Sequence, residues 1–196
     1  MKIAPQSKLP STDPVIPHLH MVLDCSGGCF GAIENLEPAL RKLHAKGRDF
    51  TLHLAGMNLK DSSPRKQIVT LTAREAFDSP NGWNDAYNSV ARMGEGDGLN
   101  EELAKRVPAN ANVLVVSDFM VGKPEIWKKL GQTRASIVLP GIQDDLGLRK
   151  PGMFPAAAPA DKSVFVEKTE MSRLLSLACM HIDEHRVRVA PQEHEF

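Results

Sequence analysis

The sequence lacks an excess of charge of either sign, because its 24 lysine and arginine residues equal its 24 aspartate and glutamate residues. A strongly basic chain is drawn to nucleic acid or to an anionic membrane by its overall field, so this balance argues against both, and any partner must be recognised locally. The sequence also lacks an apolar run long enough to span a membrane, and its first 17 residues lack the apolar core of a signal peptide. We therefore expect a cytoplasmic protein.

Cysteine is also scarce. Three cysteines are an odd number, and two of them, Cys25 and Cys29, share one short loop, which is a poor framework for disulfides and fits a reducing compartment. No basic residue adjoins either thiol to lower its pKa, so we expect buried, unreactive cysteines.

The length of 196 residues, with 42% hydrophobic residues, suffices for one sizeable core. Residues 1–17 contain four prolines among polar residues, which predicts a flexible N-terminal arm. We expect one domain over residues 18–186, with a proline- and alanine-rich excursion at 149–162 and a C-terminal tail at 187–196.

Short apolar segments alternate with amphipathic ones along this domain. The predicted strands are 19–23, 50–55, 67–72, 112–117, 136–139 and 164–166, and the predicted helices are 34–46, 85–92, 100–107, 124–130 and one from about residue 170. This order predicts an α/β fold: a doubly wound, mostly parallel, six-stranded, Rossmann-like sheet with helices on both faces.

Two acidic residues follow the two most apolar strands. Asp24 ends the first strand within the segment DCSGG, and Asp118 ends the strand at 112–117. Ligands of doubly wound sheets gather at the carboxyl ends of the central strands. Two carboxylates and the Ser26 hydroxyl suit Mg²⁺ or Mn²⁺ better than a phosphate. The alternative is that Asp24 caps a helix and Asp118 closes a turn.

The segment Asp-x-Ser-Gly-Gly, the helix opening Gly-Trp-Asn-Asp at 82–85 and the strand ending Ser117-Asp118 resemble the von Willebrand factor A domain and its metal-ion-dependent adhesion site. The order of elements from Leu19 to about His185 is similar as well. The resemblance implies that Asp24, Ser26 and Asn84 hold the ion, directly or through water, with Asp118 close by. It also implies an open coordination position that accepts a partner's carboxylate.

The match to that family's motif is incomplete. Gly28 occupies the place of a second serine, so one hydroxyl is missing, and Asn84 stands where the family has a threonine. Phe119 stands where the family has a small glycine.

The resemblance leads to the expectation of a protein-binding module, an adaptor in a larger assembly, with no catalytic residues. Two alternatives remain open: a metal-free structural subunit with a degenerate site, and a magnesium-dependent hydrolase or phosphotransferase helped by Lys123. The seven histidines, among them His18, His20 and His53, are expected to be ordinary surface or edge residues.

Overall fold

The computed structural model describes residues 18–26, 29–56, 67–90, 101–108, 111–118, 133–138, 163–165, 173 and 175–180. The predicted arm at 1–17, the helix at 124–130, the excursion at 149–162 and the tail at 187–196 lie outside these residues. Among the described residues, no helix is long and apolar enough to cross a membrane.

The strands form one sheet in the order β3-β2-β1-β4-β5-β6. Their bounds are β1 Leu19–Asp24, β2 Phe50–Ala55, β3 Ile68–Thr72, β4 Asn112–Ser117, β5 Thr133–Val138 and β6 Ser163–Phe165. All neighbouring strands pair in parallel except β2 and β3, which are antiparallel. The α/β class predicted from the sequence is confirmed.

The described helices differ in their bounds from the predicted ones. They are α1 Phe30–Glu34, α2 Glu37–Ala45, α3 Ala73–Phe77, α4 Gly82–Ser89 and α5 Glu101–Arg106, and residues 173 and 175–180 are also helical. The helix predicted at 34–46 corresponds to α2, which begins three residues later than predicted, whereas α4 begins three residues before the helix predicted at 85–92; α1 was not predicted. Pro38 lies in the first turn of α2, where its missing N–H costs nothing.

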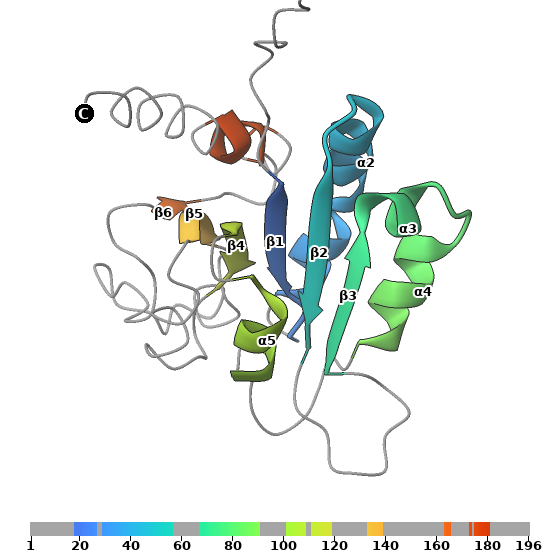
Figure 1. Ribbon diagram of the computed structural model, residues 1–196, viewed down its shortest axis with the longest axis horizontal. Helices are drawn as coiled ribbons and strands as arrows, with labels where there is room; N and C mark the ends of the chain where they lie inside the picture. The colour runs from blue at the N-terminus through green and yellow to red at the C-terminus, as the bar shows by residue number, and fades with distance from the viewer. Residues whose placement is uncertain are drawn as a thin grey trace, which may run out of the picture.

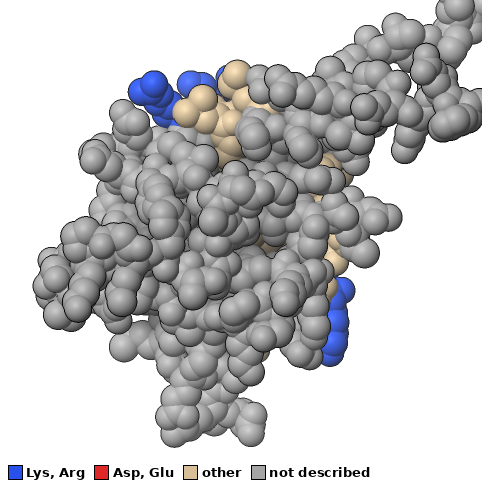
Figure 2. All heavy atoms as spheres, turned by 90° about the vertical axis from the view of Figure 1, so that its left-hand side faces the viewer, with Lys and Arg blue, Asp and Glu red and all other residues tan. Residues whose placement is uncertain are grey.

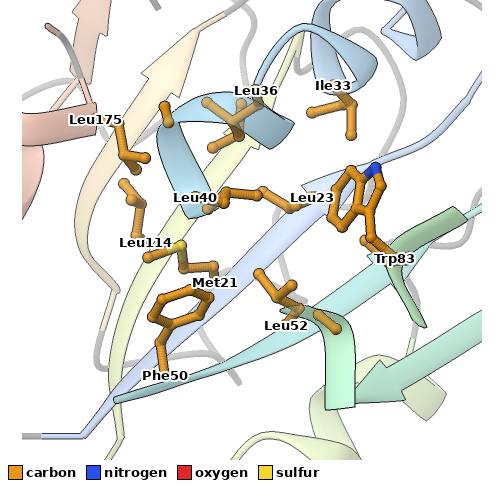
Figure 3. Packing of buried hydrophobic residues seen from close by; sticks show 14 of the residues in the cluster. Met21, Leu23, Ile33, Leu36, Leu40, Phe50, Leu52, Trp83, Leu114 and Leu175 are labelled. Atoms are coloured by element: carbon orange, nitrogen blue, oxygen red, sulfur yellow. The ribbon is translucent and has the colours of Figure 1, made fainter. Parts of the chain in front are cut away.

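The pleat of the sheet directs side chains alternately to two buried clusters. On one face, Met21, Leu23, Leu52 and Leu114 pack with residues of α1, α2 and α4 and with Leu175, as Figure 3 shows. On the other face, the smaller cluster of Val22, Ala55, Ile68, Val113 and Val115 packs with Leu103 of α5. Figure 1 shows α5 apart from the group formed by α2, α3 and α4.

The end of α2 follows the sequence prediction at Gly47. This glycine has φ +80°, donates its N–H to the His44 carbonyl (2.8 Å), and is followed by Arg48, whose N–H reaches the Leu43 carbonyl (3.3 Å). These two bonds make a Schellman motif, which satisfies carbonyls that the helix end leaves open.

The helix α3 was not predicted from the sequence. Its start is a capping box: the Thr72 hydroxyl accepts from the Glu75 N–H (3.2 Å), and the Glu75 carboxylate accepts from the Thr72 N–H (2.7 Å). The spacing Thr-x-x-Glu, visible in the sequence, is the signal that would have found it.

The helices α3 and α4 approach each other closely at Gly82. A Cβ built on Gly82 would collide with the carbonyl oxygen of Glu75, a backbone atom that cannot move alone. By contrast, a Cβ built on Gly31 in α1 meets nothing within 4 Å.

We predict that Gly82→Ala lowers the free energy of unfolding by about 2 kcal/mol, because the added methyl overpacks the α3–α4 contact. The matched variant Gly31→Ala raises it by roughly 0.5 kcal/mol, because alanine loses less backbone entropy in a helix. Urea denaturation followed by circular dichroism measures both changes. Equal effects of the two variants would contradict the close approach at Gly82.

Candidate functional site

The parallel pairing of β1 with β4 brings the two predicted strand ends together. Leu23 pairs with Val116, so the next residues, Asp24 and Ser117, are neighbours on one face of the sheet. The Ser117 hydroxyl donates a hydrogen bond to Asp24 Oδ2 at 2.6 Å. Asp24 is 4% exposed and Ser117 is fully buried. The Asp24 carboxylate is therefore held in one orientation at the carboxyl end of the strand.

The second carboxylate oxygen of Asp24 organises the following turn. The Ser26 N–H donates to Asp24 Oδ1 at 2.9 Å, and the Ser26 carbonyl accepts from the Cys29 N–H at 3.0 Å. Cys29 is the N-cap of α1 and makes no side-chain capping bond. Asp24 therefore holds a turn, and the alternative that it caps a helix is wrong.

Cys29 completes a cluster with both predicted acids. The backbone N–H of Asp118 donates to Cys29 Sγ at 3.3 Å, and Asp118 is 5% exposed. One donor atom from each of Asp24, Cys29 and Asp118 lies within 4.8 Å of the other two. Among the residues that the structure describes, this is the one group of three or more histidine, cysteine or acidic side chains with such convergence.

The sequence analysis missed Cys29 as a site residue. It directly follows Gly28, where the resemblance would place a hydroxyl, so its position beside the gap in the motif was the available signal. The expectation that it is buried is confirmed, and none of Cys25, Cys29 and Cys179 forms a disulfide.

The carboxylates of Asp24 and Asp118 give the cluster a negative electrostatic potential. The pKa of the Cys29 thiol is raised well above its usual value, first by burial and then by the charges of Asp24 and Asp118. This direction is opposite to that of a reactive thiolate. Negative potential and converging donors instead favour a cation.

The donor set fits a divalent cation. Carboxylate oxygens suit Mg²⁺ and Mn²⁺, whereas a sulfur donor suits softer ions. Ser26 is half-buried in the turn beside Asp24. The remaining predicted ligand, Asn84, has an exposed side chain on α4, and no interaction given for the described residues joins it to Asp24, Ser26 or Asp118. Gly28 and Phe119 lie outside the described residues.

A second polar cluster lies on the sheet face covered by α5. His53 is fully buried, which makes the expectation of a surface or edge position wrong for this residue. Its Nε2 and Nδ1 share hydrogen bonds with His20 Nδ1 (3.0 Å) and with the Thr70 hydroxyl (3.1 Å). His18 is exposed and contacts Asp49 (3.1 Å), as expected of an edge histidine. The alternation His-x-His, with a third histidine on β2, gave no sign of this burial in the sequence.

A hollow of about 520 Å³ lies at β3 and α5 and is lined by Thr70, Glu102 and Arg106, among others. Its lining includes none of the three clustered donors. Arg106 reaches both Glu102 Oε1 and the Ile68 carbonyl at 3.4 Å, so its charge is already engaged. We assign no ligand to this hollow.

No family model and no curated protein matches the sequence. Among solved structures, that of proximal thread matrix protein 1 from the mussel byssus aligns with a TM-score of 0.44 and 13% identity. The alignment covers 85% of this chain and 46% of that one, so the chain spans less than half the length of that protein.

We predict that Asp24→Asn stabilises the metal-free protein, by about 1 kcal/mol. The amide oxygen still accepts from the Ser26 N–H and the amide N–H can donate to the Ser117 oxygen, while one of two crowded charges is removed. Thermal denaturation in the presence of a chelator measures the change, with the exposed Asp85→Asn as the matched control. A destabilised Asp24→Asn would mean that the carboxylate serves the turn rather than a ligand.

We also predict acid sensitivity from His53. Its pKa is lowered to about 4, first by burial and then by the charges of His20 and Arg106. Well above pH 6.5 the His53 imidazole is neutral in both the folded and the unfolded protein, so it does not lower the free energy of unfolding. As the pH falls from about 6.5 to about 4, only the unfolded state gains the proton, which removes about 3 kcal/mol of stability. Urea denaturation across this range should show a steeper loss for the wild type than for His53→Gln, and parallel curves would contradict it.

Proposed function

We propose that this protein is a von Willebrand factor A-like protein-binding module that holds a divalent cation at the carboxyl ends of β1 and β4. The main support for this proposal is that the Asp24 and Asp118 side chains approach each other at that edge. The chain goes from β1 to β2 on one side and returns to β4 on the other, so the strand order reverses between β1 and β4. In doubly wound sheets such a switch point is where ligands bind.

The proposal assigns separate tasks to the residues of the site. Asp24 is held by the Ser117 hydroxyl and the Ser26 N–H, so its carboxylate needs little reorganisation to bind an ion. Ser26, in the turn after β1, and Asp118, after β4, offer further oxygens. When bound, the ion supplies a coordination position for a carboxylate of a partner protein. No bond of the partner is broken, so the module is an adaptor rather than an enzyme.

Local recognition of a protein partner fits the distribution of charge. On the face in Figure 2, the described lysine and arginine side chains lie at separate edges and form no continuous basic patch among the described residues. Nucleic-acid binding depends on such a patch. We therefore propose a protein partner in the cytoplasm as the occupant of the site.

The two alternatives predict different behaviour. A metal-free structural subunit needs no ion, and its buried acids would serve the turn alone. A hydrolase or phosphotransferase needs a cation such as Lys123 beside the reacting group, and that residue lies outside the described part of the chain. The crowding of Asp24, Cys29 and Asp118 favours ion binding over the first alternative.

Ion binding is measurable through Trp83. This residue is 1% exposed and belongs to the same buried cluster as Leu23 and Ile33, which flank the site in β1 and α1 (Figure 3). The chain has two tryptophans, and Trp127→Phe leaves Trp83 as the one that fluoresces. We predict that divalent cations change the fluorescence of this variant saturably and raise its melting temperature. Asp24→Ala abolishes both responses, whereas Asp85→Ala keeps them.

The outcome separates the functions. Flat responses to Mg²⁺, Mn²⁺ and Zn²⁺ alike would favour the structural subunit. Turnover of a generic phosphatase substrate that Asp118→Asn stops would favour the hydrolase. A partner captured with the ion, released by a chelator and not captured by Asp24→Ala supports the binding module.

A further inference from the structure

We propose that the site is selective for a borderline transition metal, Zn²⁺ foremost, with Cys29 Sγ as a ligand beside the carboxylates of Asp24 and Asp118. This inference rests on the proposed function, since it concerns the ion at the same site. It departs from the Mg²⁺ or Mn²⁺ that the resemblance implies.

The geometry of the donors carries the inference. Each of the three side chains comes from a different part of the fold: the end of β1, the N-cap of α1 and the residue after β4. Their donor atoms all lie within 4.8 Å of one another, and Cys29 is fully buried. Its sulfur also accepts a hydrogen bond from the Asp118 N–H at 3.3 Å, which joins the start of α1 to the end of β4.

The chemistry of the donors sets the choice of ion. Mg²⁺ takes oxygen ligands in a strict octahedron and retains water, whereas Zn²⁺ accepts cysteine sulfur and carboxylate oxygen together. Three protein ligands leave the fourth tetrahedral position of Zn²⁺ open, as in zinc sites that bind an external ligand. When the sulfur binds the ion, its S–H proton leaves to solvent.

Hydrogen bonds support two of the ligands, Asp24 and Cys29, as acceptors. Ser117 and the Ser26 N–H hold the two oxygens of Asp24, and the Asp118 N–H holds Cys29 Sγ. Such outer contacts orient metal ligands before binding. The neighbouring Cys25 differs, because its Sγ donates to the Leu23 carbonyl at 3.6 Å and it is not one of the three clustered donors.

The pair Cys29 and Cys25 therefore offers a matched test. Full-length protein is stripped with a chelator, kept reduced, and titrated with Co²⁺, whose bond to a thiolate produces a charge-transfer band in the near ultraviolet. The wild type and Cys25→Ser are expected to show this band, and Zn²⁺ displaces Co²⁺ even in a large excess of Mg²⁺. Cys29→Ser loses the band, and its Zn²⁺ affinity falls by about 100-fold, the upper end of the losses seen for outer-shell changes.

The possible results separate this inference from the proposed function. Mg²⁺ binding as tight as Zn²⁺ binding, unchanged in Cys29→Ser, overturns the zinc inference and leaves the proposed function standing. A band that survives in Cys29→Ser also overturns it. No binding of any divalent ion, with correctly folded protein, overturns both.

A second measurement needs no variant. X-ray absorption at the zinc edge of the wild-type complex is expected to show a sulfur neighbour at about 2.3 Å together with nearer oxygen neighbours. A shell of oxygen and nitrogen alone would overturn the inference even if Cys29→Ser failed to fold.

Discussion

The parallel pairing of β1 with β4 is the constraint on which the candidate site depends. Its register places Asp24 beside Ser117, and the 2.6 Å hydrogen bond between them fixes one carboxylate. Asp118, the next residue, then meets Cys29 through its backbone N–H. A slip of one residue would turn Asp24 and Ser117 to opposite faces, because side chains alternate along a strand. The apolar residues of both strands therefore stabilise the register that brings Asp24 beside Ser117.

The two faces of the sheet bury clusters of different size. One face carries the large cluster with α1, α2 and α4, and it includes the stacked rings of Phe77, Trp83 and Tyr87. The other carries a smaller apolar cluster under α5 and, beside it, the chain of His20, His53 and Thr70. Burying a histidine costs free energy unless both ring nitrogens have partners, and here both do. The larger apolar cluster offsets the cost of these buried polar groups.

The sequence predicted the central strands because residues 113–116 of β4 are continuously apolar and β1 is interrupted only by His20 before its closing acid, as expected of strands covered on both faces. In β2, apolar residues alternate with Thr51 and His53, which also indicates a strand. It also predicted that Asp24 and Asp118 share an edge, since parallel strands end together. It failed where the result depends on tertiary packing. The full burial of His53 and the approach of Cys29 to both acids are two such results. Neither follows from local spacing.

The role of the turn at residues 24–29 follows from comparing its two ends. At its start, the Asp24 carboxylate accepts hydrogen bonds from the Ser26 N–H and the Ser117 hydroxyl; at its end, Cys29 Sγ accepts a hydrogen bond from the Asp118 N–H. Cys29 directly follows Gly28, where the resembling motif has a hydroxyl, and one donor atom of each acid lies within 4.8 Å of its sulfur. In the proposed zinc site this sulfur is the third ligand, in place of the missing hydroxyl. On that proposal, the incomplete motif reflects a change of ion rather than the loss of the site.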